Sequence, residues 1–580
     1  MRNKFTFNHN PVLSEKIPLW RARFVLLMLL VAMGALVVRA MWLQGVKNNF
    51  LQAKGESRYE RVIELPATRG RILDRHGDVL AISSPVRSIW AIPDDAQLSP
   101  AQTRQLAALL GLDVAELSRK LGSDKDFVYL KRQVPPDQAE KIAALNLPGI
   151  HSQTEYRRFY PTSEVAAHVV GFTDVDDKGQ EGIELAFQKY LVGRAGNRRV
   201  IKDRRGHIVE DVDSINKPQE GSDVDLALDA KVQYLAYSAL QQAVTANKAK
   251  AGSAIVLDAR TGEVLALVNS PTYNPNNRVG LSGEQLRNRA LTDTFEPGSI
   301  MKPFTAALAI ESGRFRPDTV INCAPGRMTI GTATISDSHA HGALTVAEVI
   351  QKSSNIGSAK MALTMPPEEM WRMFDSLHFG TAPKLGFPGE AAGRLRPFKS
   401  WRPIEQATMS YGHGISVTLM QIAQAYLAFA RDGDLIPISL SKVEVAPGHG
   451  SSVFSVKTAR AIRGMLETVI QPGGTATQAQ VPGYRVGGKT GTAYKLEGGA
   501  YVHKYVSSFV GIGPISDPRL IVAVMIDEPN GGKHFGGEVA GPVFAQIMGG
   551  SLRTLGVAAD APLRTMQVAH GQAEAAKEEM

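Results

Sequence analysis

A large α+β domain over residues 221–556, behind one membrane-spanning helix and a separate N-terminal domain, is the architecture that the sequence predicts. A helical pattern and two strand patterns open this segment, and two strand patterns and a helical pattern close it. Both ends of the segment then contribute to one sheet, so we expect an antiparallel sheet packed on helices. The chain has 580 residues, which is more than one ordinary domain holds.

Residues 24–43 are predicted to cross a membrane once. The run from Phe24 to Val38 contains no charge, Arg39 can extend its guanidinium toward the interface, and Trp20 and Trp42 flank the run as interfacial anchors. A cleavable signal peptide is the alternative, but bulky residues stand where small residues precede a cleavage site. We therefore expect a retained anchor.

Charge predicts the orientation of this anchor. Residues 1–23 carry five basic side chains and one acidic side chain. The positive-inside rule then places residues 1–23 in the cytoplasm as a short tail and the chain after residue 43 on the other side of the membrane. The predicted location is a cell inner membrane, with a single span and a periplasmic catalytic part.

Residues 44–220 form the predicted non-catalytic domain, which ends in the polar linker Asn216–Gly221. A charged set near its start is expected to form ion pairs that stiffen the junction between the domains; it comprises Arg69, Arg71, Asp74 and Arg75. Residues 557–580 are rich in Ala and Glu without apolar periodicity, and are predicted to be a disordered tail.

Four patterns predict the elements of the large domain. Asp229 is a candidate N-cap for a helix with an apolar stripe from Val232 to Val244. Residues 253–268 read as two strands joined by a turn at Thr261–Gly262. Residues 505–514 and 519–527 are further strands, and residues 540–556 have the pattern of a covering helix.

Composition excludes several classes of protein. Hydrophobic residues make up 44% and charged residues 21%, which are ordinary globular values. The net charge is +9, but much of it lies before the span, and no zinc-finger spacing or basic stretch with interleaved aromatics is present, so nucleic acid is not expected as a partner. Cys323 is the one cysteine, which rules out an intramolecular disulfide.

The first candidate motif is the Ser-x-x-Lys of Ser299 and Lys302. Pro297 and Gly298 break the chain just before a helical run, so Ser299 is expected at a helix N-terminus. Residues three apart share a helical face, and the free N–H groups of a first turn can bind a developing oxyanion. Alone, this pattern is more typical of an N-cap serine beside a solvated lysine.

The second candidate motif is Ser353-Ser354-Asn355, at the end of a helical run. A hydroxyl and a carboxamide two residues apart on a turn can point into one cleft. Ser353 would then relay a proton and Asn355 would hold a substrate amide. Serine and asparagine also populate turns for structural reasons, so the motif is weak by itself.

The third candidate motif is Lys489-Thr490-Gly491-Thr492, within a glycine-rich strand pattern. Glycines let another backbone approach closely, so this strand can accept an extended peptide at its edge. The cation and the hydroxyls suit a carboxylate. The spacing excludes a phosphate-binding P-loop.

A fourth cluster, Asp337-Ser338-His339-Ala340-His341, could be taken for metal ligands, but two alternating histidines on a loop favour a structural role. No metal or organic cofactor is expected.

The three motifs, in the order S-x-x-K, S-x-N, K-T-G, resemble those of the penicillin-recognising serine enzymes. Residues 252–277 and 410–426 are similar to the class B penicillin-binding proteins, and residues 69–83 and 157–174 resemble the non-catalytic dimerisation or pedestal domain of that family. Within the class, the short N-terminal domain and residues 505–529 look most like the division-specific, septal enzyme.

The resemblance implies cross-linking of peptidoglycan stem peptides that end in D-Ala-D-Ala. Ser299 would be acylated with Lys302 as its base, and Lys489, Thr490, Gly491 and Thr492 would bind the substrate. Burial and the charge of Lys489 are expected to lower the pKa of Lys302. The implied partners are stem peptides, β-lactam antibiotics, a membrane glycan polymerase and other division proteins.

Four alternatives stay open at this point. An elongation-type transpeptidase shares the whole pattern. A serine β-lactamase shares the motifs, but no E-x-x-L-N pattern lies between Asn355 and Lys489. A bifunctional enzyme would need the E-D-x-x-F-x-x-H motif of a glycan polymerase, which is absent before residue 220. A β-lactam sensor would share the motifs without turnover.

Overall fold

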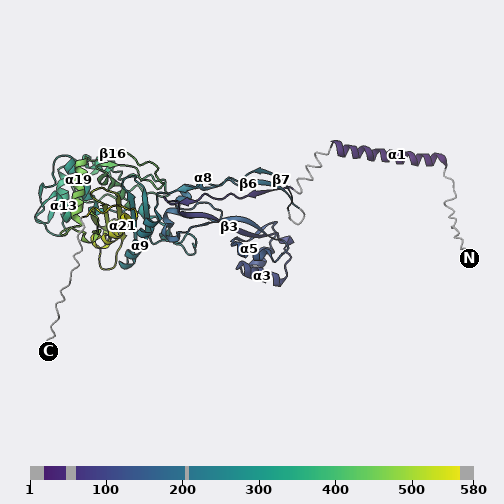
Figure 1. Cartoon of the computed structure of the whole chain (residues 1–580), viewed down its shortest axis with the longest axis horizontal. Coiled ribbons are helices and arrows are strands. Elements are labelled where there is room, and N and C mark those ends of the chain that lie inside the picture. Colours follow the sequence, from purple (N-terminus) through teal and green to yellow (C-terminus); the bar gives the residue numbers. More distant parts are fainter. Residues whose placement is uncertain (1–17, 47–59, 203–207, 562–580) are drawn as a thin grey trace, which may run out of the picture. The chain divides into compact units, whose positions relative to one another are not determined.

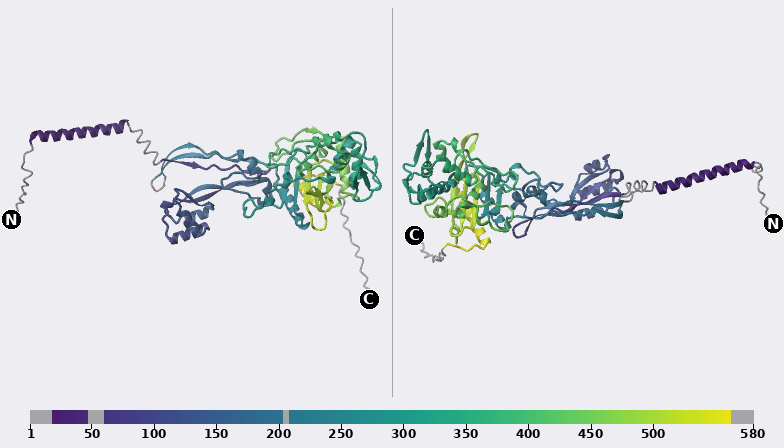
Figure 2. Two further views of the ribbon diagram at one scale, coloured as in Figure 1. Left: turned by 180° about the vertical axis from the view of Figure 1, so that it is seen from behind. Right: turned by 90° about the horizontal axis from the view of Figure 1, so that it is seen from above.

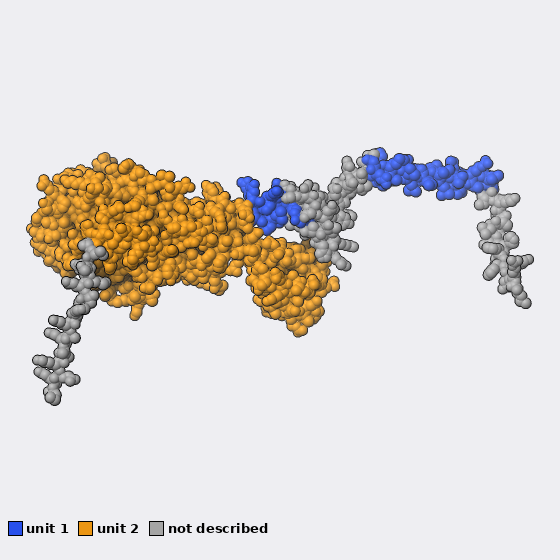
Figure 3. Space-filling view, viewed as in Figure 1, with its two compact units in different colours: residues 1–67, 194–219 blue, residues 68–193, 220–580 orange. Residues whose placement is uncertain are grey.

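The computed structural model describes residues 18–46, 60–202 and 208–561. They form two compact units, shown in different colours in Figure 3. Unit 1 comprises residues 1–67 and 194–219, and unit 2 comprises residues 68–193 and 220–580. Residues 68–193 therefore group by their contacts with the catalytic part. The non-catalytic domain over 44–220 stays a prediction.

The elements of unit 1 are α1 (Leu19–Met41), the π-helical turn η2 (Trp42–Val46), β1 (Glu60–Leu65), β6 (Gly196–Lys202) and β7 (Ile208–Asn216). The three strands form an antiparallel sheet in the order β1-β6-β7. Helix α1 is apolar, with a mean hydropathy of 2.5 over its most apolar window, and none of that window is buried inside the structure. It is long enough to cross a membrane, and it begins five residues before the predicted position, at Leu19.

The first part of unit 2 contains β2 (Ile72–Leu73), β3 (Val79–Ala91), η3 (Pro93–Asp95), α3 (Pro100–Leu110), α4 (Val114–Leu121), β4 (Val128–Val134), α5 (Pro136–Ala143), β5 (Ile150–Phe159), η4 (Ser163–Val165), α6 (Ala167–Val170), α7 (Gly182–Ala186) and α8 (Gln188–Leu191). Strand β3 pairs with both β4 and β5. Helices α3, α4 and α5 close a small hydrophobic core of their own around Leu106, Leu110 and Leu117.

The catalytic part contains β8 (Val224–Asp225), α9 (Ala230–Ala246), β9 (Ala251–Asp258), β10 (Val264–Ser270), α10 (Gly283–Leu286), α11 (Arg289–Thr292), η5 (Gly298–Met301), α12 (Lys302–Glu311), β11 (Val320–Asn322), β12 (Arg327–Ile330), β13 (Ala333–Ser336), β14 (Ala343–Thr345), α13 (Val346–Lys352), α14 (Asn355–Leu363), α15 (Pro367–Ser376), η6 (Phe398–Ser400), α16 (Pro403–Met409), α17 (Leu419–Ala425), α18 (Leu427–Ala430), β15 (Asp434–Leu435), β16 (Ser451–Ser452), α19 (Val456–Val469), η7 (Thr477–Ala479), β17 (Gly487–Glu497), β18 (Ala500–Gly513), β19 (Leu520–Asp527), α20 (Gly536–Val539) and α21 (Gly541–Thr554).

A five-stranded antiparallel sheet, in the order β10-β9-β19-β18-β17, lies at the centre of the catalytic part. Every residue of β9 and β10 is buried, so both faces of these strands are covered. Helices α9 and α21 pack against each other and the sheet, and α17 packs against β9 and β19. Figure 1 labels α9, α13, α19 and α21 in this part, and Figure 2 shows the helices around the sheet from two further directions. The predicted α+β class is confirmed.

The predicted elements of this part are present. Asp229 caps α9, because its carboxylate accepts hydrogen bonds from the N–H groups of Lys231 and Val232. Strands β9 and β10 form the expected hairpin, with a register shift after Val264. Strands β18 and β19 and helix α21 follow the patterns at residues 505–556.

The expected ion pairs near Arg69 exist, but the strongest of them reaches a residue that the sequence did not single out. The guanidiniums of Arg69 and Arg158 each lie 2.6 Å from the carboxylate of Glu184, and all three side chains are at most 1% exposed. Arg158 also donates to the carbonyl oxygen of Gly70. The guanidiniums of Arg69 and of Arg158 on β5 therefore share the buried carboxylate of Glu184 on α7.

The rest of the charged set holds the first part of unit 2 to the catalytic part. Arg75 lies 3.4 Å from Glu263, beside β10. Asp74 makes no ion pair within the described residues; its carboxylate accepts from the N–H groups of His76, Asp78 and Ala230, at the start of α9. The junction is thus stiffened partly by backbone caps.

The first residues of the predicted tail are bonded to the catalytic part. The hydroxyl of Tyr484 donates to the carbonyl of Val557, and the carboxylate of Asp560 accepts from Arg485 N–H and from the Ser516 hydroxyl. These bonds hold residues 557–560 to the catalytic part. The remainder of the predicted tail, residues 562–580, lies outside the described residues.

Replacing Glu184 with Gln leaves Arg69 and Arg158 buried without a counter-charge. We expect Glu184→Gln to destabilise the detergent-purified chain by about 3–5 kcal/mol, seen as a lower midpoint of thermal unfolding. The control is Glu369→Gln, which breaks the exposed pair with Arg314 and should leave the midpoint nearly unchanged. Equal midpoints for the two variants would contradict the assigned role of Glu184.

Candidate active site

Ser299 lies in a short 3-10 turn that leads into α12. The turn η5 spans Gly298–Met301, and α12 begins at Lys302. Gly298 has a positive φ of 59°, and a Cβ placed on Gly412 would lie 2.2 Å from the Gly298 carbonyl oxygen, so two backbones meet here at a distance that only glycine allows. The buried hydroxyl of Tyr426 donates to the carbonyl of Ile300. The turn that presents Ser299 is therefore fixed from two sides.

Lys302 is buried directly behind Ser299. Its ammonium nitrogen lies 2.9 Å from the Ser299 hydroxyl oxygen and 3.1 Å from the Ser353 hydroxyl oxygen, and it also bonds to the carbonyl oxygen of Ser353. The side chain is 0% exposed. Burial lowers the pKa of Lys302 to about 7, while the attraction of the Asp337 carboxylate opposes this shift. A substantial fraction of Lys302 is therefore neutral near pH 7 and able to accept a proton.

Ser353 connects the two lysines of the motifs. It ends α13 in the left-handed region at φ 63°, a conformation that costs a non-glycine residue about 1–2 kcal/mol. This backbone turns its carbonyl and its hydroxyl toward Lys302, and the hydroxyl oxygen also lies 2.9 Å from the ammonium of Lys489. Ser299, Lys302, Ser353 and Lys489 thus form one continuous hydrogen-bonded chain.

This series of hydrogen bonds continues along β17, the strand that carries the K-T-G motif. The ammonium of Lys489 lies 3.2 Å from the hydroxyl oxygen of Thr490, which lies 3.0 Å from that of Thr475. Lys489 is 0% exposed, and its pKa is lowered well below the usual value by burial and by the charge of Lys302. The repulsion between the two ammonium groups favours one neutral and one charged lysine.

Gly491 and Thr492 bring β17 against the turn that holds Ser299. A Cβ on Gly491 would lie 2.3 Å from the Ser508 hydroxyl oxygen and 2.9 Å from the Pro297 carbonyl oxygen, so no larger residue fits. The hydroxyl of Thr492 accepts from the N–H of Gly536 at 3.0 Å. Strand β17 is the last strand of its sheet, so one edge is open to an added peptide strand.

Asn355 begins α14, and its amide nitrogen donates to the carbonyl oxygen of Ser336 at 2.9 Å. This bond orients the carboxamide. The half-buried side chain keeps its oxygen and one N–H for another partner.

Asp337 is the residue that motif reasoning missed. Its carboxylate accepts from the Ser354 hydroxyl at 2.7 Å and from the N–H groups of Asn355 and Ile356. It therefore caps α14 and fixes the S-x-N turn. Asp337 belongs to the Asp337–His341 cluster, for which a structural role was predicted, and these bonds fit such a role. Among the described residues, no group of three or more potential ligands is arranged to hold a metal ion.

Family comparisons agree with this geometry. The model of the penicillin binding protein transpeptidase domain matches residues 252–549, and that of the penicillin-binding protein dimerisation domain matches residues 64–226. The chain is similar to a probable peptidoglycan D,D-transpeptidase, PenA, of Neisseria gonorrhoeae, with 45% identity over 94% of this chain and 95% of that protein. It is also 41% identical to the peptidoglycan D,D-transpeptidase FtsI of Escherichia coli K12, over 93% of each chain.

Solved structures show the same likeness. The transpeptidase domain of penicillin-binding protein 3 from Burkholderia pseudomallei is 54% identical, with a TM-score of 0.54 over 58% of this chain and 98% of that chain. A peptidoglycan synthetase from Bifidobacterium adolescentis is 28% identical, with a TM-score of 0.68 over 87% of this chain and 98% of that chain. The chain belongs to the penicillin-binding proteins that combine a dimerisation domain with a peptidoglycan D,D-transpeptidase domain.

Proposed function

We propose that this chain cross-links peptidoglycan at the division septum, with Ser299 as the nucleophile and Lys302 as its base. The observation that carries the proposal is the hydrogen-bonded chain from Ser299 through Lys302 and Ser353 to Lys489, beside the open edge of β17. The likeness to D,D-transpeptidases over more than nine-tenths of the chain supports the reaction.

The first step acylates Ser299. Neutral Lys302 takes the hydroxyl proton while the Ser299 oxygen attacks the carbonyl carbon between the two D-Ala residues of a donor stem peptide. The carbon–nitrogen bond breaks, and the proton passes through the Ser353 hydroxyl to the nitrogen of the terminal D-Ala, which leaves. The product is an ester on Ser299, and Lys302 is neutral again.

The second step transfers the acyl group. An amine of a neighbouring stem peptide attacks the ester carbon, the ester bond breaks, and the amine proton returns through Lys302 to the Ser299 oxygen. One peptide bond is thus exchanged for another, and the reaction needs no external energy source.

The substrate-binding roles follow from the placement of the remaining motif residues. A donor peptide that adds to the edge of β17 lies between this strand and Asn355, whose carboxamide would hold a peptide amide. Lys489, Thr490 and Thr492 would bind the terminal carboxylate. The N–H groups of Ser299 and Thr492 would form the oxyanion hole, which typically contributes a few kcal/mol.

The proposed location is the inner membrane, with α1 as a single span, residues 1–23 in the cytoplasm and the catalytic part in the periplasm. The basic residues before the span support this orientation. The relative named FtsI supports the septal role. A membrane glycan polymerase and other division proteins are the proposed partners, because the chain lacks a recognisable polymerase motif of its own.

Labelling with fluorescent penicillin tests the nucleophile. We expect one labelled peptide, carrying Ser299, and we expect Ser299→Ala to lose both the label and the release of D-Ala from a stem-peptide analogue. The control Ser312→Ala, at the end of α12, should keep both. Label that persists in Ser299→Ala would refute the assignment. Label without D-Ala release would favour a sensor, and rapid loss of the label would favour a β-lactamase.

The low pKa of Lys302 predicts a pH profile for acylation. A lysine is a base only when neutral, so the rate constant for acylation by penicillin should rise about tenfold between pH 6 and pH 8, with its midpoint near the pKa of about 7. Stopped-flow measurement of acylation at fixed ionic strength gives this profile. A flat profile would show that Lys302 is not the base.

Asp337→Asn provides a second variant for the same profile. The Asp337 carboxylate favours protonated Lys302, so its removal should lower the pKa of Lys302 and move the midpoint to lower pH. The control is Asp318→Asn, an exposed residue outside the site, which should leave the midpoint in place. A midpoint that rises in Asp337→Asn would contradict the assigned electrostatics.

The proposed partnership predicts that the span does more than tether the protein. If α1 contacts a membrane polymerase, replacing Leu19–Met41 with an unrelated apolar helix should preserve penicillin labelling but prevent septum formation, which leaves filamentous cells. Division at the normal rate with the replaced helix would show that any anchor suffices.

A further inference from the structure

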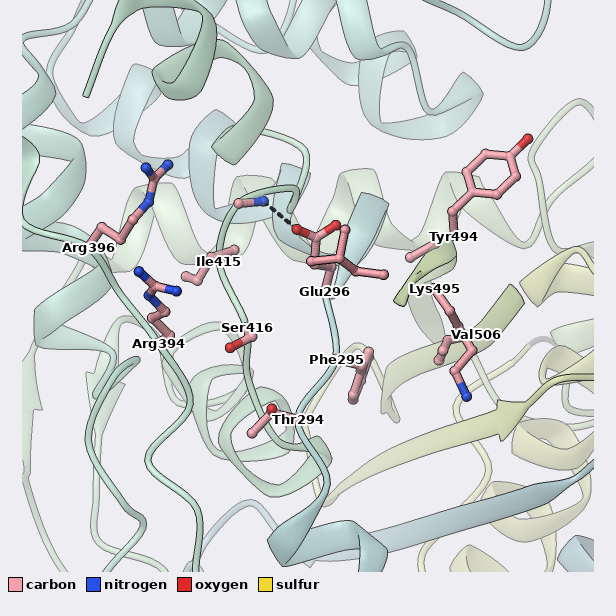
Figure 4. A pocket seen from close by; sticks show the side chains of 13 residues that line it. Thr294, Phe295, Glu296, Arg394, Arg396, Ile415, Ser416, Tyr494, Lys495 and Val506 are labelled. Atoms are coloured by element: carbon pink, nitrogen blue, oxygen red, sulfur yellow. Dashed lines mark hydrogen bonds between the residues drawn. The ribbon is translucent and has the colours of Figure 1, made fainter. Parts of the chain in front are cut away.

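A hollow of about 460 Å³ lies beside the candidate active site (Figure 4). Its wall includes Thr294–Glu296, just before the turn that presents Ser299, and Ala493–Leu496, which continue β17 beyond Thr492. The mechanism above assigns no role to this hollow. It shares two chain segments with the site, so a substrate bound along β17 passes it.

Two guanidiniums lie together on one side of this hollow. Figure 4 shows Arg394 and Arg396 on the side opposite Tyr494 and Lys495, with Glu296 between them. The Arg394 backbone is fixed, because its N–H and carbonyl bond reciprocally with Ser416 at 2.7 and 3.1 Å. The backbone that carries Arg394 is thus held in place by its pairing with Ser416.

Glu296 and Lys495, two other charged groups in the wall, already have hydrogen-bonding partners. The carboxylate of Glu296 accepts from the N–H of Gly414 at 2.8 Å and from the Tyr501 hydroxyl at 2.9 Å. The ammonium of Lys495 lies within 3.0 Å of both carboxylate oxygens of Asp527, and in Figure 4 it points away from the arginines. These groups have their partners without a ligand.

Arg394 is the exception. Arg396 shares the carboxylate of Glu405 at 3.1 Å. The guanidinium of Arg394, an exposed residue, makes no hydrogen bond or ion pair with the described part of the chain. An unpaired guanidinium beside a second arginine attracts a carboxylate, which it can bind through two parallel hydrogen bonds.

The apolar wall and the open strand edge define which carboxylate fits. Phe295, Ala493 and Val506 line the side next to β17, so a side chain that reaches Arg394 from a peptide on this strand must be apolar along its stem and anionic at its end. An antiparallel peptide whose scissile carbonyl lies at Thr492 places the residue before the D-Ala pair opposite the next part of β17. Residues 493–496 span about 13 Å of strand, which covers one to three further peptide residues.

We propose that Arg394 and Arg396 form a subsite for a free carboxylate on the side chain of the donor residue that directly precedes D-Ala-D-Ala. The inference rests on the proposed transpeptidase function and deepens it, because it names a feature of the donor that penicillin lacks. Arg394 is a specificity residue here: it contacts the substrate far from the reacting bond.

The test compares two donor peptides that differ in one group. Both end in D-Ala-D-Ala, and the preceding residue has a long side chain that ends in a carboxylate in one peptide and in a carboxamide in the other. We expect the detergent-purified full chain to release D-Ala from the carboxylate donor with a kcat/KM about five to ten times higher. Arg394→Gln should reduce this ratio to about one, and added salt should weaken the preference of the unmodified chain.

Two controls separate the inference from the proposed function. Penicillin acylation should stay within about twofold in Arg394→Gln, which shows that the variant is folded, and Arg372→Gln, an exposed arginine on α15, should keep the donor preference. Release of D-Ala from both donors at equal rates by the unmodified chain would overturn the subsite but not the enzyme. Release from neither would overturn the proposed function. A preference that depends only on a carboxylate in an added acceptor peptide would assign the hollow to the acceptor and refute the donor subsite.

Discussion

The burial of two lysines around one serine hydroxyl is the constraint on which the site depends. Lys302 and Lys489 are both fully buried, and both contact the oxygen of Ser353. Two ammonium groups so close in a low-dielectric interior repel each other strongly, so the pair is most stable with one proton fewer. Packing therefore favours a state in which one of the two lysines is neutral. Exclusion of water lowers the pKa of Lys302 to about 7.

Keeping this arrangement requires backbone that ordinary sequences avoid. Ser353 and Gly298 hold left-handed conformations, and Gly412 and Gly491 allow segments to approach within distances that a Cβ would block. The cost is offset by fixed partners around them, such as the Asp337 carboxylate at the start of α14. Strain is thus concentrated where the hydroxyls and ammonium groups must meet.

Sequence analysis identified the three motifs but not the residues that orient their side chains. Periodicity found α9, the β9–β10 hairpin and the closing strands, because each is a local pattern. The resemblance of the three motifs to those of penicillin-recognising enzymes predicted one site that contains Ser299, Lys302 and Lys489. Asp337 and Glu184 were not predicted in these roles, since each contacts residues distant in sequence that only the fold brings near. Residues 68–193 contact the catalytic part through pairings of the same kind, since β2 pairs with β8, about 150 residues later.

The contacts between the first part of unit 2 and the catalytic part include the start of α9. Asp74 and Asp229 both serve the start of α9, and His76 lies 3.0 Å from the Asp229 carboxylate, so the catalytic helix is capped partly by the N-terminal part. Yet the solved transpeptidase domain from Burkholderia pseudomallei covers only 58% of this chain and has the same fold. The N-terminal part is therefore not needed to form that domain in the relative. The Asp74 cap consequently ties the catalytic part to the preceding part of unit 2, whereas the Glu184 pairs stabilise that preceding part itself.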